Sequence, residues 1–336
     1  MNNASVTCSK RKSLRLLALL MALLCLVSCA QSSEITDATD EVEPIEYLNE
    51  SPKLTVSLSS AAVTAGAKGI ELPNRISNEY LSPILSRLNE ASYACAMYYV
   101  DLETGLSITY NEDRFFAGAS LIKAEYMMSV FEMIQNGHIS YDDLYTYTKA
   151  NKRGGTSEIP KEKNFGDQLT LKEIIEYLIY HSDNTAYNML LSYVRSYDSF
   201  TDWAEDRYGT TFYFKGCNWL NAVGVAECWK EIYERYKAGD EDYLWYVSLL
   251  KVANENKFVK GGLPKDSNGK ALYEVAHKYG MEISASNDAA IVFYEDRPYL
   301  LIILTDYIGY NTQYFMNRIS EDVFALHEYI CSADED

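Results

Sequence analysis

A short apolar segment that carries one serine and one lysine ends at Lys123. It reads Phe116-Ala117-Gly118-Ala119-Ser120-Leu121-Ile122-Lys123. The apolar residues that follow have the i, i+3, i+4, i+7 spacing of an amphipathic helix: Ala124, Met127, Met128, Phe131 and Ile134. We therefore predict a helix that starts at Ser120 and ends near Gly137. On such a helix Ser120 and Lys123 are one turn apart on the same face, so the lysine amine can reach the serine hydroxyl.

This pairing suggests nucleophilic catalysis. A serine hydroxyl is a weak nucleophile until a base removes its proton, and a lysine can be that base if burial and nearby cations lower its pKa. The start of a helix also favours negative charge, which would stabilise an oxyanion beside Ser120. The spacing alone is weak evidence, because average composition gives about one chance match in a chain of this length. The segment Ser9 to Lys12 is such a match.

Two further short elements strengthen the hypothesis by their order along the chain. The first is Ser182-Asp183-Asn184, and the second is Lys278-Tyr279-Gly280. Ser182 supplies a hydroxyl that can relay a proton, and Asn184 an amide that can hold polar groups of a substrate. Lys278, on a predicted edge strand, offers a cation for a substrate carboxylate, and Gly280 leaves room for substrate beside the backbone.

The periodicity along the chain predicts strands at both ends and helices in the middle. The predicted strands are 93–100, 106–110, 273–277, 289–294 and 299–305. The predicted helices are 76–88, the helix from Ser120, one after a capping box at Thr170 and Glu173, and 186–194, 227–237 and 313–331. We therefore expect an α+β fold, with an antiparallel sheet built from N- and C-terminal strands, flanking helices and an inserted all-helical subdomain.

In these three elements the chain resembles class A β-lactamases and penicillin-binding proteins, whose signature is Ser-x-x-Lys, Ser-Asp-Asn and Lys-Thr-Gly. The resemblance extends from about Ile76 to the C-terminal helix. It implies an acyl-enzyme formed on a β-lactam or a D-alanyl peptide-like substrate, in a cleft between the sheet and the helical subdomain. The roles that it implies are Ser120 as nucleophile, Lys123 as its base, Ser182 as proton relay, Lys278 as carboxylate anchor, and the backbone amides of Ser120 and Met281 as oxyanion hole.

The chain departs from this pattern at two positions. Tyr279 replaces the small hydroxyl residue of the third element, and its bulk is expected to hinder access of β-lactams or binding of a carboxylate. In the segment Cys217-Asn218-Trp219-Leu220-Asn221, Cys217 stands where class A enzymes have the glutamate that activates the deacylating water. A thiol is a poor substitute for that base. Glu205 and Glu227 are alternatives that no spacing supports, so we expect slow deacylation.

Two other interpretations stay open. The chain could be a non-hydrolytic surface lipoprotein that uses this fold to bind or sense a ligand, as the changes at Tyr279 and Cys217 would allow. A Ser-His-Asp triad is a weaker alternative. His181 and His277 lie beside two of the elements, but the sequence has no Gly-x-Ser-x-Gly motif.

The N-terminus predicts export. Basic residues from Lys10 to Arg15 precede an apolar run, Leu16 to Val27, that is too short to span a bilayer. The next residues, Ser28-Cys29, complete a segment that resembles a bacterial lipobox. We expect a signal peptide over 1–28, lipidation of Cys29, a flexible tether over 29–72 and a hydrolase domain over 73–336, on the outer face of the cell membrane.

The net charge and the content of His and Cys indicate which kinds of ligand and partner the chain is unsuited to bind. The formal net charge is -18, which disfavours nucleic-acid binding. The chain shows no metal-ligand spacing among its 4 His and 7 Cys, and we expect no cofactor. We expect a monomer. The pairing of Cys95, Cys217, Cys228 and Cys331 is left open by the sequence, although Cys95 is expected to be a buried apolar residue.

Overall fold

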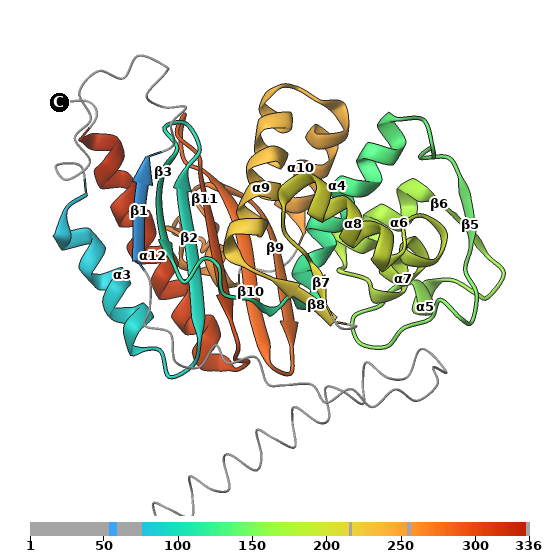
Figure 1. The fold of residues 1–336 in the computed structure, drawn as a ribbon, viewed down its shortest axis with the longest axis horizontal. Coiled ribbons are helices and arrows are strands. Elements are labelled where there is room, and N and C mark those ends of the chain that lie inside the picture. The colour runs from blue at the N-terminus through green and yellow to red at the C-terminus, as the bar shows by residue number, and fades with distance from the viewer. Residues whose placement is uncertain (1–53, 59–75, 215–216, 254–256, 334–336) are drawn as a thin grey trace, which may run out of the picture. The chain divides into compact units, whose positions relative to one another are not determined.

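The computed structural model describes residues 54–58, 76–214, 217–253 and 257–333. Its largest sheet has six antiparallel strands in the order β1-β3-β2-β11-β10-β9. The strands are β1 (Leu54–Leu58), β2 (Cys95–Asp101), β3 (Leu106–Tyr110), β9 (Glu274–Glu282), β10 (Ala285–Phe293) and β11 (Tyr299–Thr305). Strands from both ends of the sequence therefore lie side by side, which confirms the predicted α+β class (Figure 1).

Helices cover both faces of this sheet. Along β2, Met97 and Tyr99 belong to a core shared with α3 (Asn78–Glu90) and α12 (Tyr310–Ser332). The alternate residues Ala96 and Tyr98 belong to a core shared with α9 (Ala222–Lys237) and α10 (Glu241–Val252). Because successive side chains of a strand point to opposite faces, a strand covered on both sides is buried throughout, as β2 is. Figure 1 shows α3 and α12 on one side of the sheet and α9 on the other.

The middle of the chain forms the helical part. It contains the short 3-10 helix η3 (Ala119–Leu121) and the helices α4 (Ile122–Gln135), α5 (Ile159–Glu162), α6 (Leu171–Tyr180), α7 (Asn184–Tyr193) and α8 (Tyr197–Tyr208), with α11 (Phe258–Gly262) following α10. The predicted capping box at Thr170 and Glu173 opens α6 and is confirmed. Short strands that were not predicted link these helices: β4 (Phe116–Ala117), β8 (Cys217–Leu220) and β7 (Tyr213–Phe214) in one sheet, and β5 (Leu144–Thr146) with β6 (Gln168–Thr170) in another.

Several predicted boundaries differ from those observed. The helix predicted to begin at Ser120 begins as the 3-10 turn η3 and becomes α-helical only at Ile122. The helix predicted over 227–237 begins five residues earlier, at Ala222, because the Asn221 side chain accepts a hydrogen bond from the Gly224 amide at 3.0 Å and caps it. The strand predicted over 273–277 continues to Glu282, so the whole third element lies within β9.

The N-terminal prediction is only partly within the described residues. Leu54–Leu58, inside the segment predicted as a flexible tether, forms β1 and pairs with β3. The predicted signal peptide and Cys29 lie outside the described residues. Among the helices that the structure describes, none has the length and apolar character needed to cross a membrane.

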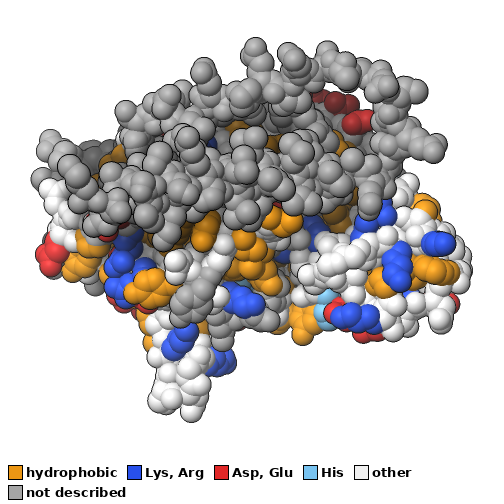
Figure 2. All heavy atoms as spheres, turned by 90° about the horizontal axis from the view of Figure 1, so that it is seen from below, with side chains coloured by type: hydrophobic (Ala, Val, Ile, Leu, Met, Phe, Trp, Pro, Cys, Tyr) orange, Lys and Arg blue, Asp and Glu red, His pale blue; other side chains and the backbone are white. Residues whose placement is uncertain are grey.

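Side chains of different kinds are mixed on the face shown in Figure 2, where lysine and arginine lie among hydrophobic and polar residues. Among the cysteines whose pairing the sequence left open, Cys95 is buried at 3% exposure, as expected. Burial raises the pKa of the Cys95 thiol to about 12, so this residue is an inert part of the core.

Candidate active site

Ser120 lies in the tight turn between β4 and α4 and is partly exposed. The residue before it, Ala119, has a φ of 46°, a left-handed conformation that costs a residue with a side chain about 1–2 kcal/mol. Such strain persists only where the surrounding structure enforces it. One such restraint is the hydrogen bond from the Gly118 amide to the Asn218 carbonyl of β8, at 2.9 Å. The turn from Phe116 to Leu121 is called the nucleophile turn below.

Lys123 lies one turn further along and is almost completely buried, at 2% exposure. Its Nζ donates to the Ser182 carbonyl oxygen at 2.6 Å, to Asn184 Oδ1 at 2.7 Å and to Ser182 Oγ at 3.4 Å. Ser120 Oγ is not among these acceptors. Burial and the positive charge of Lys278 hold the pKa of Lys123 well below its usual range, while Asp183 opposes this shift. The amine therefore has the low basicity that a neutral general base requires at moderate pH.

The junction between α6 and α7 carries Ser182, Asp183 and Asn184, as predicted. Ser182 has a φ of 54°, which turns its hydroxyl and its carbonyl toward Lys123. Asp183 fixes this conformation, because its Oδ1 caps α7 while its Oδ2 accepts from the amides of Glu158 and Ile159. Asn184 links the junction to the neighbouring loop through a bond from Nδ2 to the Gly154 carbonyl at 3.0 Å.

Lys278 reaches the same place from β9. Its Nζ donates to Ser182 Oγ at 3.0 Å and to the Tyr279 carbonyl at 2.7 Å, and its side chain is fully buried. Burial lowers the pKa of Lys278 to about 8, although the carboxyls of Asp288 and Glu125 act in the opposite direction. The structure thus brings Lys123, Ser182 and Lys278 into one hydrogen-bonded chain.

Gly280 and Met281 follow on β9, beside the nucleophile turn. A Cβ on Gly280 would lie 2.6 Å from both the Gly118 carbonyl oxygen and the Leu121 amide nitrogen, and 2.9 Å from the Ser120 amide nitrogen. We predicted that the missing side chain of Gly280 leaves room for substrate, but the backbone of the turn occupies that space. Met281 is 43% exposed at the end of the strand.

Tyr279 follows Lys278 on β9, and Lys278 Nζ lies 5.2 Å from the centroid of its ring. Since it alternates with Lys278 along β9, its ring packs on the opposite face of the sheet, against Phe258 at a centroid distance of 5.2 Å. The tyrosine in place of a small hydroxyl residue is accommodated by that core. The ring also borders the site at Lys278, and the effect of its bulk on β-lactam access stays a prediction.

The lowered pKa of Lys278 predicts an alkaline limit for carboxylate substrates. Lys278 is a cation below a pKa of about 8 and neutral above it, so acylation by a penicillin should weaken as the pH rises through 8. Acylation rates measured between pH 6 and 10 test this. The methyl ester of the same penicillin has no carboxylate and is the control. An equal alkaline decline for acid and ester would contradict the prediction.

One buried carboxyl in this region was missed by the sequence analysis. Glu125 is completely buried on α4, where its Oε1 accepts from Trp229 Nε1 of α9 at 3.0 Å. Among the described residues, its Oε2 has no hydrogen-bond partner. Burial raises the pKa of Glu125 to about 8. This burial could not be predicted from the amino-acid sequence, because a glutamate on a helix is usually exposed.

Glu125 should make stability depend on pH. Its pKa is about 4.5 in an unfolded chain and about 8 when folded, so the folded state binds more protons between these values and loses stability as the pH rises from 4.5 to 8. Glu125→Gln removes this loss. Between pH 5 and pH 8, the free energy of unfolding of the variant, measured in urea, should rise by a few kcal/mol relative to that of the wild type. Substitution of the exposed Glu234 by Gln is the control, and parallel curves for wild type and Glu125→Gln would refute the assignment.

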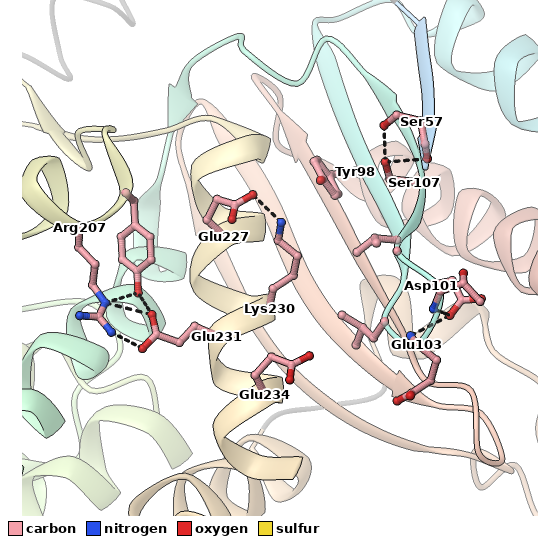
Figure 3. Close-up of a pocket in the computed structure, with 15 residues that line it drawn as sticks. Ser57, Tyr98, Asp101, Glu103, Ser107, Arg207, Glu227, Lys230, Glu231 and Glu234 are labelled. Atoms are coloured by element: carbon pink, nitrogen blue, oxygen red, sulfur yellow. Dashed lines mark hydrogen bonds and ion pairs between the residues drawn. The ribbon is translucent and has the colours of Figure 1, made fainter. Parts of the chain in front are cut away.

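The loop that carries a glutamate in class A enzymes has no counterpart among the described residues. Strand β8 ends at Leu220 and α9 starts at Ala222, with only the capping residue Asn221 between them. Cys217 is the first residue of β8. The two alternatives lie elsewhere: Glu205 is exposed on α8, and Glu227 forms an ion pair with Lys230 in a groove beside Tyr98 (Figure 3).

The histidines of the triad hypothesis do not meet Ser120. His181 ends α6 and lies edge-on against Tyr180. His277 does have a carboxylate partner, since its Nδ1 lies 3.2 Å from Asp288 Oδ1. This pair is completely buried, and His277 alternates with Lys278 along β9, so it faces the opposite side of the sheet. A structural role for both histidines fits these positions.

The groove in Figure 3 has a volume of about 820 Å³ and is a second candidate site. Most of its charged side chains already bind one another: Glu227 pairs with Lys230, and Glu231 with Arg207. Asp101 pairs with Arg297, and Glu103 with Lys237. Because all of its charged lining side chains except Glu234 are held in ion pairs, the groove offers little to a charged substrate.

Fold and site together define a class of protein. The fold is an antiparallel sheet with an inserted helical part. Its site has a serine beside a buried lysine, and a second serine whose hydroxyl accepts from this lysine and from a second lysine. This is the arrangement of active-site serine hydrolases. Comparison with known proteins gives the family. The chain matches the beta-lactamase enzyme family over residues 78–327 and belongs to it.

The relatives agree with this membership. A β-lactamase from Bacteroides uniformis is 25% identical over 269 residues, which cover 72% of this chain and 85% of the relative. β-Lactamase VEB-1 from Pseudomonas aeruginosa is 23% identical over 210 residues, which cover 55% of this chain and 68% of VEB-1. Among solved structures, PBP-A has a TM-score of 0.67 at 18% identity, covering 75% of this chain and 96% of PBP-A. A β-lactamase from Chitinophaga pinensis has a TM-score of 0.65 at 20% identity, and the match covers 74% of this chain and 100% of that β-lactamase.

Family and fold make this chain a serine hydrolase of the β-lactamase or penicillin-binding-protein type. The predicted resemblance to β-lactamases and penicillin-binding proteins, the fold class and the enzyme class are thus confirmed. The family match begins at residue 78, so β1 lies outside it and adds a strand to the edge of the sheet.

Proposed function

We propose that the enzyme forms an acyl-enzyme at Ser120 with β-lactams or D-alanyl peptide-like substrates. The observation that carries this proposal is the hydrogen-bonded chain from Lys123 through Ser182 to Lys278, placed beside the nucleophile turn. A neighbouring structure, the L158E mutant of PBP-A, is described as an acyl-enzyme complex with penicillin G. That likeness supports the substrate class.

The position of Lys123 suits a general base. A neutral amine has two N–H donors and one lone pair. The two short bonds, to the Ser182 carbonyl and to Asn184 Oδ1, use both donors of the neutral amine. The longer bond to Ser182 Oγ is made by the protonated amine, so the neutral amine has a lone pair to accept a proton. In the proposed step Lys123 takes the proton of Ser120 as Ser120 Oγ bonds to the substrate carbonyl carbon. The amides of Ser120 and Met281 stabilise the negative oxygen that results.

Collapse of the intermediate breaks the carbon–nitrogen bond of the substrate. The leaving nitrogen takes a proton from the Ser182 hydroxyl, which recovers one from protonated Lys123, so that Lys123 returns to its neutral state. Lys278 has no exposed surface, so its charge acts on the substrate carboxylate chiefly through Ser182, to which it donates. Asn184 supports both steps by orienting Lys123.

We further propose that deacylation is slow. Cys217 cannot replace a carboxylate base at neutral pH without a strongly lowered pKa. Asn221, at the other end of the same segment, is engaged in capping α9. The enzyme would then trap penicillins and act more as a penicillin-binding protein than as an efficient antibiotic-degrading enzyme.

Incubation of the purified protein with a fluorescent penicillin, followed by mass measurements over time, tests both proposals. We expect a mass increase of one penicillin that is absent from Ser120→Ala and lasts for hours. A transient adduct would support acylation and refute slow deacylation. A folded protein that forms no adduct would refute both, and would favour the alternative, a lipoprotein that binds or senses a ligand without turnover.

The site of action is also a proposal. We propose that the chain is exported, lipidated at Cys29 and held as a monomer on the outer face of the membrane. The basic and apolar N-terminal segments and the lipobox-like Ser28-Cys29 support this. Membrane fractions from cells that make the wild type should contain the protein, whereas Cys29→Ala should release it. Equal partition of both forms would contradict the proposal.

A further inference from the structure

The strained nucleophile turn needs restraints, and one of them comes from a residue outside the three sequence elements. Asn287 on β10 is completely buried. Its Nδ2 donates to the Ala117 carbonyl at 2.7 Å and to the Gly118 carbonyl at 3.4 Å. Its Oδ1 accepts from the Thr305 amide of β11 at 3.1 Å. One amide side chain thus ties the backbone before Ser120 to the centre of the sheet.

The position of Asn287 in the sheet explains why it can do this. Asn287 is the direct cross-strand partner of Gly280 on β9, so the two residues face the same side of the sheet. At Gly280 the missing side chain admits the backbone of the turn. At Asn287 the amide binds the same backbone, through its carbonyls. The two residues together hold the nucleophile turn against the sheet. Gly280 leaves space for its backbone, and Asn287 donates hydrogen bonds to its carbonyls.

We propose that Asn287 is a positioning residue for acylation, which holds the nucleophile turn so that Ser120 stays aligned with Lys123 and with the oxyanion-binding amides. The inference rests on the proposed function, because it concerns the rate at which Ser120 is acylated. The left-handed conformation of Ala119 relaxes if the bonds that enforce it are lost. Small displacements of a nucleophile then cost much rate, about 100-fold for 1 Å.

The test replaces Asn287 by leucine, which has a similar size and no donor. We expect the acylation rate constant with a fluorescent penicillin to fall on the order of 100-fold. The dissociation constant of the initial complex should change less than threefold, since Asn287 is buried beneath the turn and does not contact substrate.

Thr305→Val is the matched control. Thr305 is equally buried in the adjacent strand, and its Oγ1 donates to the Ser286 carbonyl at 2.7 Å without contacting the turn. It should cost stability as Asn287→Leu does, but leave the acylation rate constant within threefold of the wild type. The inference is overturned if Asn287→Leu acylates as fast as the control, or if the control loses as much rate.

Hydrogen–deuterium exchange separates this inference from the proposed function, because it needs no substrate. In Asn287→Leu, amides of the peptide spanning Phe116 to Leu121 should exchange at least tenfold faster than in Thr305→Val. That result supports the restraint even if no penicillin acylates the wild type, an outcome that would count against the proposed function alone. Equal exchange in the two variants overturns the inference.

Discussion

Replacement of Lys123 by arginine should lower the rate of acylation by about 10³-fold, within the range that general-base catalysis contributes. A guanidinium keeps its proton at any accessible pH, so it cannot accept one from Ser120. Burial and the charge of Lys278 hold the pKa of Lys123 low, which lets the lysine act near neutrality. The measurement is the rate of fluorescent-penicillin labelling at pH 7.

The exposed Lys149 provides the control, since Lys149→Arg makes the same chemical change away from the site. The Lys149→Arg variant should be labelled by the fluorescent penicillin at the wild-type rate. Thermal unfolding must show that Lys123→Arg is folded, because a larger cation in a buried pocket also strains its surroundings. Retention of more than a tenth of the wild-type rate by a folded Lys123→Arg would mean that another group removes the proton.

The second large effect is expected at Gly280. Alanine there would place a methyl group 2.6 Å from the Gly118 carbonyl oxygen and the Leu121 amide nitrogen. Backbone atoms cannot rotate away as a flexible side chain can, so either β9 or the turn must move. We expect Gly280→Ala to lower the free energy of unfolding by about 1–3 kcal/mol. Displacement of the turn should slow acylation about 100-fold.

Gly154→Ala is the matched control, since a Cβ there has no heavy atom within 4 Å. Its free energy of unfolding should stay within about 0.5 kcal/mol of the wild type. Urea unfolding and penicillin labelling of both variants decide the question. If Gly280→Ala behaved like Gly154→Ala, the turn would not be seated on β9 as described.

The sequence predicted those parts of the fold that depend on local pattern. The bounds of β3 and β11 match the prediction. Strand β3 alternates apolar and polar residues, β11 is an apolar run, and turn residues delimit both. Strands β4 and β8 were missed, because two to four residues carry too little alternation to be recognised. The Asn221 cap was missed as well, and with it the true start of α9.

The sequence likewise predicted only those parts of the candidate site that belong to short motifs. Ser120, Lys123, Ser182 and Lys278 could be proposed from the sequence because each belongs to a short motif with its own chemistry, and the structure brings Lys123, Ser182 and Lys278 together. The contacts of Gly280 and Asn287 with the nucleophile turn could not be read from the sequence, since their partners lie more than 150 residues away. Glu125 was missed because α4 was interpreted as amphipathic, whereas its residues from Ile122 to Phe131 are all buried.

Burial of α4 on every side has a consequence for how the enzyme fails on heating. A helix packed among α6, α8 and α9 cannot shift unless these helices repack, so its first turn keeps its place for as long as the domain keeps its core. Enzymes with a nucleophile on a peripheral loop can become inactive while still folded. Here the loss of reactivity and the cooperative melting of the domain should coincide, without an intact but inactive form between them.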